Sequence, residues 1–251
     1  MSDTYTITYP KTGILSSDKK VPYLLDEKLG KAIEVAITLN MPLLLTGEPG
    51  TGKTRLAEKI ALDLSSAEGS QFLPEPLVFN TKTSSSAKEL FYQYDALRHF
   101  HDANLKIDAK KTLTTSDYIQ LHALGEAIVL TNPSEIGGAY LDKKYEACKS
   151  SVVLIDEIDK APRDFPNDIL AEIERFQFEI KETNNYLMKK GEDHQIVLIM
   201  TSNSEKNLPE AFLRRVIFYH IPFPGPKQLA KIVNSHLEIG SQKESDKPMA
   251  D

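Results

Sequence analysis

Apolar runs along the chain alternate with segments in which apolar residues recur every three or four positions. Five of the runs are continuous rather than alternating, and we expect them to be strands that helices bury on both faces: residues 42–46, 77–80, 152–156, 196–202 and 216–221. The spacing of three and four predicts helices after Asp26, from Lys53, and over residues 164–176. This order of elements indicates an α/β fold with a largely parallel sheet.

The stretch between the second and third strands, residues 81–151, is longer than a crossover requires, because a crossover needs only about 10 to 12 residues including its helix. We therefore expect an insertion, helical near residues 87–103 and 116–130. Its aromatic side chains are expected to bury it against the main domain: Tyr92, Tyr94 and Phe100. His99 and His101 are expected to be solvated, since two histidines without a third ligand make a poor zinc site.

The two ends are more polar than the middle of the chain. Residues 1–20 are expected to form an N-terminal extension, in which Tyr5, Ile7 and Tyr9 alternate as in a short edge strand. Residues 21–224 are expected to form the main domain. Residues 225–251 would begin a further helical part and end in a tail that is disordered from Gly240.

Composition narrows the class of protein. The 251 residues are 41% hydrophobic and 26% charged, which is typical of a soluble globular chain. The net charge of -6 and pI of about 5.6 argue against generic coating of nucleic acid. No apolar run approaches the roughly 20 residues of a membrane span, and no secretory signal is expected. Cys148 is the single cysteine, so no intrachain disulfide can form, and a reducing cytoplasm is the expected location.

A glycine-rich run follows the first strand and directly precedes an amphipathic helix: Gly47, Glu48, Pro49, Gly50, Thr51, Gly52, Lys53 and Thr54. This is the P-loop pattern in the context it requires. Its glycines let backbone N–H groups point at phosphate oxygens, and the helix N-terminus adds partial positive charge. Lys53, on a solvent-facing loop, would bridge the β- and γ-phosphates, and the Thr54 hydroxyl would bind Mg²⁺. The run predicts a nucleoside triphosphate site.

The third strand ends in two acids, which is typical of the second half of such a site. Asp156 would hold Mg²⁺ through its water shell, and Glu157 would take a proton from the attacking water. The alternative for Glu157 is a cap on the following loop. Asp159 is open between capping the helix region near Asp164 and pairing with Lys160.

Two further polar positions follow the fourth strand. Asn203 would orient the attacking water, although its Thr-Ser-Asn-Ser context is also a good turn. Arg214 and Arg215 precede the fifth strand, and one of them would project into a neighbouring subunit's nucleotide. The alternative is that both arginines are ordinary surface charges.

From residue 21 to residue 236 the sequence resembles AAA+ ATPases, and within them the MoxR group, especially CoxD-like members associated with von Willebrand A-domain proteins. The similarity rests on residues 41–46 leading into the P-loop, and on residues 90–95, 155–161 and 201–215. The resemblance implies a five-stranded sheet of order 5-1-4-3-2, an insertion in the second helix and a ring of six subunits. It also implies that Mg-ATP hydrolysis at subunit interfaces drives the remodelling or maturation of a protein client, with a von Willebrand A-domain protein as a partner.

The resemblance also implies roles for single residues. Asn203 corresponds to sensor 1, Arg215 to the arginine finger with Arg214 as the alternate, and Asn80 to the polar residue that restrains Glu157 until a partner binds. The sequence departs from the family in its helical lid, of which residues 225–237 supply only the beginning. The lid is therefore expected to be truncated or reduced to one helix, and no sensor 2 residue is assigned.

Two other functions share the P-loop. A small-molecule kinase is disfavoured because the adjacent Asp156 and Glu157 suit activation of water better than activation of a substrate hydroxyl. A GTP-dependent motor is the other alternative, although the guanine-reading Asn-Lys-x-Asp run is absent from the sequence.

Overall fold

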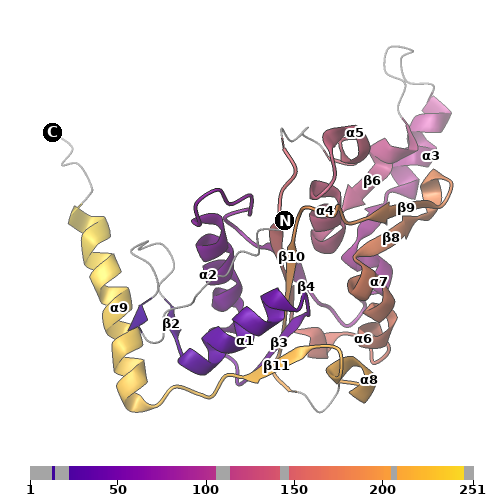
Figure 1. The fold of residues 1–251 in the computed structure, drawn as a ribbon. Helices are drawn as coiled ribbons and strands as arrows, with labels where there is room; N and C mark the ends of the chain where they lie inside the picture. Colours follow the sequence, from indigo (N-terminus) through magenta and orange to yellow (C-terminus); the bar gives the residue numbers. More distant parts are fainter. Residues whose placement is uncertain (1–12, 15–22, 106–113, 142–146, 205–207, 246–251) are drawn as a thin grey trace.

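The computed structural model describes residues 13–14, 23–105, 114–141, 147–204 and 208–245 (Figure 1). At its centre five parallel strands lie in the spatial order β11 (Ile217–His220), β3 (Leu43–Thr46), β10 (Ile196–Ser202), β7 (Ser151–Asp156) and β4 (Leu77–Asn80). All five predicted strands are present, and the expected order 5-1-4-3-2 is confirmed strand for strand. The α/β class is confirmed with it.

Helices cover both faces of this sheet. Its three inner strands are buried as predicted, but the edge strands β4 and β11 are partly exposed, with Val78 at 45% and Phe218 at 43%, so the prediction of burial on both faces is wrong for these two. Val152 and Leu154 of β7 pack in one core with α1 (Glu27–Thr38) and α2 (Lys53–Ser65). Val153 and Ile155 point the other way and pack with α4 (Ala123–Leu130), α6 (Phe165–Asp168) and α7 (Leu170–Arg175). Figure 1 shows α1 and α2 on one side of the sheet and α4, α6 and α7 on the other. Burial on both faces leaves the strand ends as the place where polar groups gather.

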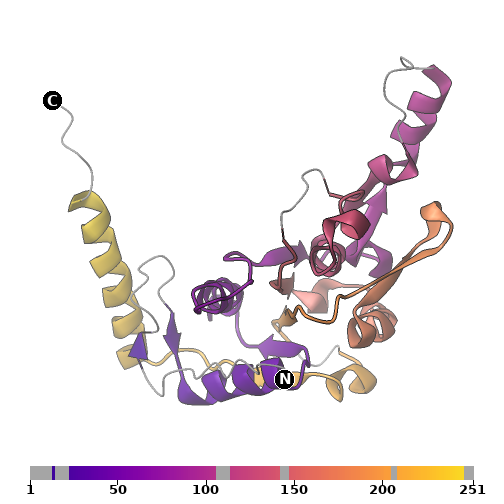
Figure 2. The same cartoon turned by 45° about the horizontal axis from the view of Figure 1, so that its top comes forward.

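The segment between β4 and β7 contains more strand than the sequence indicates. It runs through η1 (Ala87–Leu90), β5 (Tyr92–Tyr94), α3 (Ala96–Leu105), η2 (Thr115–Tyr118), β6 (Ile119–Leu121), α4 and α5 (Ser134–Gly137). The antiparallel pair of β5 and β6 was missed because each strand has only three residues, too few for a period-2 pattern. In Figure 2, α3 projects from the body at the end of the molecule opposite α9 (Pro226–Ser245).

The aromatic and histidine positions of this segment only partly follow expectation. Tyr92 is buried, but Phe100 is 72% exposed on α3, so the prediction that it buries the segment is wrong. His99 is half-buried: its ring stacks on Tyr118 and its Nδ1 contacts the Tyr94 hydroxyl, so the expected solvation of His99 is also wrong. His101 is exposed.

A second antiparallel pair, β8 (Gln177–Ile180) and β9 (Tyr186–Lys189), was also missed. The helix expected over residues 164–176 is divided into α6 and α7, and Phe176 ends α7 in a left-handed conformation with φ 44°. The turn η4 (Lys181–Thr183) joins the hairpin to the segment that follows β4, because Glu182 accepts hydrogen bonds from Lys88 and Tyr92, each at 2.8 Å.

At the N-terminal side, β1 (Gly13–Ile14) pairs antiparallel with β2 (Leu24–Leu25). The edge strand expected at Tyr5 to Tyr9 lies outside the described residues. At the other end, α9 continues to Ser245, so the disorder expected from Gly240 is wrong for residues 240–245. Residues 246–251 lie outside the described part of the chain. Of the helices in that part, none has both the length and the apolar character to cross a membrane.

Candidate functional site

The loop between β3 and α2 takes backbone conformations that glycine permits. Gly47, Gly50 and Gly52 have φ of 149°, 85° and 86°. A Cβ atom on Gly47 would lie 2.5 Å from the Ile221 carbonyl oxygen, so a side chain cannot fit there. Because α2 begins at Lys53, directly after Gly52, the unpaired N–H groups of its first turn lie at this loop. The geometry is that of an anion cradle.

Lys53 is buried rather than solvent-facing, which corrects the sequence-based expectation. Only 7% of the surface of Lys53 is exposed. Its Nζ donates to the carbonyl oxygens of Gly47 at 2.7 Å and Glu48 at 3.0 Å, and to Asn203 Oδ1 at 3.0 Å. Burial lowers the pKa of Lys53, and the nearby carboxylate of Asp156 is the largest of the charges that oppose this shift. An anion bound in the loop would favour the charged lysine further.

Thr54 and Asp156 meet at the carboxyl end of the sheet. The Thr54 hydroxyl donates to Asp156 Oδ1 at 3.2 Å and Oδ2 at 3.1 Å, although the two residues lie 102 positions apart. The Thr201 hydroxyl on β10 contacts the same carboxylate. Hydroxyl and carboxylate oxygens are the ligands that Mg²⁺ prefers, so these side chains fit a magnesium site.

Glu157 follows β7 in a left-handed conformation, with φ 56° and ψ 49°. Its N–H donates to Thr201 Oγ1 at 2.8 Å, and its carboxylate pairs with Lys160 at 2.5 Å. Hydrogen bonding to Glu157 raises the pKa of Lys160. Asn80 lies opposite Asp156 in the β4–β7 register, and Asn80 is exposed. The contact printed for the Glu157 carboxylate is thus with Lys160, and the restraint that the resemblance implies for Asn80 stays a prediction.

Asn203, directly after β10, forms hydrogen bonds with both Lys53 and Asp159. Its Oδ1 accepts from Lys53, and its backbone N–H donates to Asp159 Oδ1 at 3.2 Å. The sequence left Asp159 open between capping the region near Asp164 and pairing with Lys160, and its hydrogen bond to Asn203 is neither of these. The Asp159 carboxylate holds the chain after β10.

The two arginines before β11 lie apart from this cluster and pair with exposed acids. Arg214 Nη2 donates to Glu210 on α8 (Glu210–Leu213) at 2.7 Å. Arg215 pairs with Glu174 of α7 at 2.5 Å and donates to the Ala211 carbonyl oxygen at 2.9 Å. The structure therefore brings together the P-loop, Asp156 and Asn203, but it does not bring the arginines to them.

A cavity of about 730 Å³ adjoins the P-loop, and apart from Gly50, Thr51 and Gly52 the sequence pointed to none of its lining residues as part of a site. Its walls come from β2, the start of α1, the end of β11 and α9, as well as from Gly50, Thr51 and Gly52. A Cβ atom on Gly52 would lie 3.2 Å from the Tyr23 ring. No local pattern could have identified this cavity, because its walls join residues near position 25 to residues near position 230.

Two tyrosines and an acid are among the polar residues that line this cavity. The Tyr219 hydroxyl donates to Asp26 Oδ2 at 2.7 Å, so Asp26 uses its carboxylate there and does not cap α1 with it. Burial, with a smaller effect of this hydrogen bond, raises the pKa of Tyr219 to about 12. Burial also raises the pKa of Tyr23. Both hydroxyls therefore stay protonated and can donate hydrogen bonds at neutral pH.

Comparison with known proteins adds a family to this geometry. No curated protein matches the sequence. Among solved structures, the S. cerevisiae Hsp104-ADP complex is similar with a TM-score of 0.45 and 18% identity, over 84% of this chain and 36% of that chain. The present chain thus spans about a third of the length of that one.

The family described as AAA domain (dynein-related subfamily) matches residues 42–216, well over half of the chain. The match begins at β3 and ends before β11, so it contains the P-loop, the two acids after β7, Asn203 and both arginines. AAA domains in general are nucleotide-binding ATPase domains. The chain belongs to the dynein-related subfamily of AAA domains.

Proposed function

We propose that this chain is a MoxR-type AAA+ ATPase that binds and hydrolyses Mg-ATP at subunit interfaces and uses the cycle to remodel a protein client. The observation that carries the proposal is the contact of Thr54 with Asp156, at 3.1 and 3.2 Å. It joins the end of the P-loop to the end of β7, so the two side chains that we propose as ligands of one cation lie in contact. Lys53 and Asn203 flank this contact.

The residues of the cluster divide the work. Backbone N–H groups at the start of α2 and the Lys53 ammonium would bind the phosphates, because both present positive charge at the loop. Thr54 and Asp156 would hold Mg²⁺, which supplies neutralisation of phosphate charge when bound. The Glu157 carboxylate would leave Lys160 and accept a proton from water. The Asn203 amide would orient that water.

The cavity beside the P-loop supports a nucleoside triphosphate rather than a simple phosphate. Its volume of about 730 Å³ lies within the range of small-molecule sites. Its wall includes the aromatic rings of Tyr23 and Tyr219. We propose residues 21–224 as the nucleotide-binding domain and α9 as the beginning of a lid, since Lys227 and Lys231 of α9 line the same cavity.

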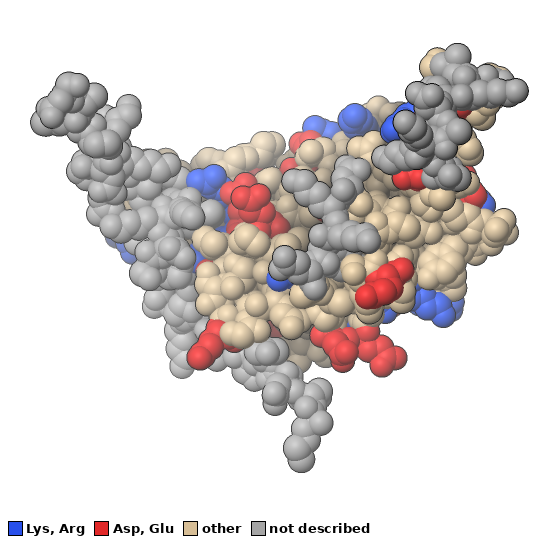
Figure 3. Space-filling model, turned by 90° about the horizontal axis from the view of Figure 1, so that it is seen from above, with Lys and Arg blue, Asp and Glu red and all other residues tan. Residues whose placement is uncertain are grey.

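Several properties of the surface support assembly and a protein client. Arg215, with Arg214 as the alternate, would reach the nucleotide of a neighbouring subunit in a ring of six. Leu97 and Phe100 on α3 are 84% and 72% exposed and offer apolar contact area to a client. On the face seen in Figure 3, Lys and Arg stand in separate groups rather than in a continuous stripe, which fits a protein client better than nucleic acid.

A von Willebrand A-domain partner and a cytoplasmic location complete the proposal. The partner follows from the resemblance to CoxD-like proteins. The proposed location rests on the sequence, in which Cys148 is the single cysteine.

The test is nucleotide-dependent assembly combined with turnover. Light scattering with and without a non-hydrolysable ATP analogue should show a hexamer only with the analogue, and the protein should release phosphate from ATP in the presence of Mg²⁺. Calorimetry should show tighter binding of ATP than of GTP. Transfer of phosphate to an acceptor molecule without phosphate release would instead establish a kinase, and preferential GTP binding would establish a GTP-dependent motor.

A further inference from the structure

The Asp159 carboxylate connects the two polar residues that follow β7 and β10. Asp159 lies on η3 (Ile158–Lys160), directly after Glu157. Its Oδ1 accepts the backbone N–H of Asn203 at 3.2 Å. The turn itself is closed by the Lys160 N–H, which donates to the Glu157 carbonyl oxygen at 2.9 Å. The backbone positions of Glu157 and Asn203 are therefore linked through one short turn.

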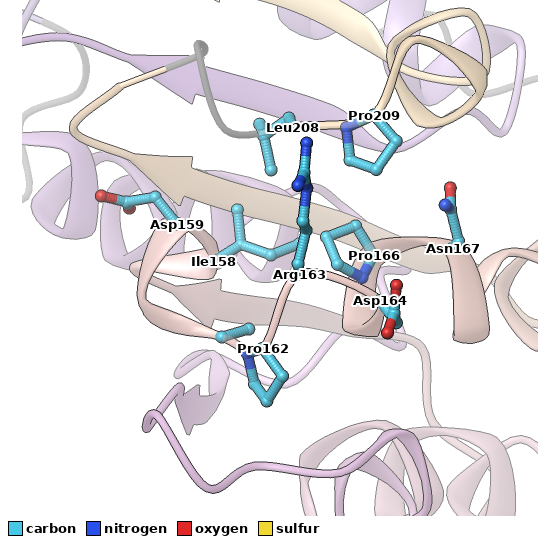
Figure 4. Close-up of a pocket in the computed structure, with 10 residues that line it drawn as sticks. Ile158, Asp159, Pro162, Arg163, Asp164, Pro166, Asn167, Leu208 and Pro209 are labelled. Carbon is cyan, nitrogen blue, oxygen red and sulfur yellow. The ribbon is translucent and has the colours of Figure 1, made fainter.

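Asp159 also lines a second cavity, of about 650 Å³, which shares no lining residue with the cavity beside the P-loop. Figure 4 shows the Asp159 side chain extending away from Arg163, Pro166 and Asn167, on the side where the chain leaves β10. Asp164 lines the same cavity, but the hydrogen bond to the chain after β10 comes from Asp159. The two acids thus line one cavity, and of the two Asp159 is the one that accepts the Asn203 N–H.

We propose that Asp159 is a positioning residue for hydrolysis, which holds Asn203 in register with Glu157. The inference rests on the proposed function. Asn203 is bound at both ends, since its Oδ1 accepts from Lys53 while its N–H is held by Asp159. If the Lys53 ammonium binds phosphate instead of Asn203, the hydrogen bond to Asp159 still holds the Asn203 backbone. The Asn203 side-chain amide can then turn toward the attacking water while the backbone stays in place.

Hydrolysis should be sensitive to this hydrogen bond, while nucleotide binding should not. A displacement of about 1 Å in a group that orients a reactant can cost about 10²-fold in rate. Asp159→Ala should therefore lower kcat by about 10- to 100-fold and leave KM and the affinity for a non-hydrolysable analogue near their wild-type values. Asp159→Asn keeps an acceptor oxygen and should restore most of kcat. Asp164→Ala, the matched control in the same cavity, should behave as wild type.

Exchange of the Asn203 backbone amide with solvent deuterium tests the positioning without any turnover. Asp159→Ala should speed this exchange by at least about tenfold, because the amide loses a hydrogen bond to a charged acceptor. Asp159→Asn and Asp164→Ala should leave it slow. Unchanged exchange in Asp159→Ala would overturn the inference whatever the ATPase assay shows.

The kinetic results separate this inference from the proposed function. If the wild type hydrolyses no ATP, the proposed function fails, and the exchange rates still decide whether Asp159 holds Asn203. If the wild type is active but Asp159→Asn loses as much kcat as Asp159→Ala, the hydrogen bond is not what matters and the positioning role is overturned. Equal losses of kcat, nucleotide affinity and melting temperature in Asp159→Ala would show a merely structural role.

Discussion

The phosphate site and the arginine pair before β11 differ in how they are held. Lys53 is 7% exposed and bonded to three oxygens, whereas the Arg214 side chain is 71% exposed and pairs with an acid that is 80% exposed. Exposed ion pairs are worth only about 0.2 to 1 kcal/mol. The arginines can therefore exchange their present partners for others at small cost. The contrast is between a buried group held by three hydrogen bonds and exposed arginines held by weak pairs, and the proposed contact of an arginine with a neighbouring subunit requires arginines that are held in this weak way.

Arg215→Ala should have the largest effect, and it should appear in turnover alone. We expect near-normal ATP binding and a kcat lower by about 10³- to 10⁵-fold, the contribution of an arginine finger in other phosphoryl-transfer enzymes. Steady-state phosphate release together with calorimetry measures both quantities. Arg214→Ala is the matched control and should lose much less.

Mixing variants tests whether the arginine acts between subunits. Inactive Arg215→Ala and inactive Glu157→Gln subunits should regain some activity together, because some interfaces then combine an intact arginine with an intact base. If activity does not recover on mixing, under conditions where subunits demonstrably exchange, Arg215 acts within its own chain or only as a surface charge, and the proposed contact between subunits is wrong.

Glu157→Gln should come next in size. The amide cannot take the water's proton, so we expect a loss of about 10²- to 10⁴-fold in kcat with Mg-ATP binding retained. Single-turnover phosphate release measures the chemical step directly. If this variant turns over at the wild-type rate, Glu157 is not the base and only forms part of the turn that follows β7.

Lys53→Ala should affect binding rather than turnover alone. Removing a buried cation that pairs with phosphate should weaken ATP affinity by about 10²- to 10³-fold, and calorimetry measures the change. Since Lys53 also ties Gly47 and Glu48, its loss should lower the melting temperature slightly. Lys31→Ala, on the exposed face of α1, is the control for loss of a lysine. Unchanged ATP affinity would contradict the phosphate assignment.

Lys160→Met should have the smallest effect, and in the opposite direction. Its partly exposed ion pair with Glu157 restrains the proposed base, and loss of about 0.2 to 1 kcal/mol would raise basal turnover by no more than about fivefold. The same small rise should follow from added salt in the wild type, because salt screens exposed pairs. A fall in turnover would mean that Lys160 assists the reaction instead of restraining Glu157.

Much of the fold could be predicted because its signals are local and long enough to read. The five strands are four to seven residues long, and the continuous apolar character of the three inner ones reflects burial on both faces. The elements that were missed are short or depend on turns. The strand Tyr92–Tyr94 has three residues, and the hairpin of β8 and β9 turns at Asn184 and Asn185, which both have positive φ. Local propensity carries little information at that length.

By itself, the sequence determined the P-loop and the two acids after β7, because each is a run of adjacent residues whose chemistry is readable in order. Only the tertiary structure decided that Lys53 is buried against Asn203, which lies 150 positions away, and that Asp159 holds the amide of that asparagine. The physical reason lies in the parallel sheet. It brings the carboxyl ends of β3, β7 and β10 to one edge, and a pattern read along the chain contains no measure of which side chains meet there.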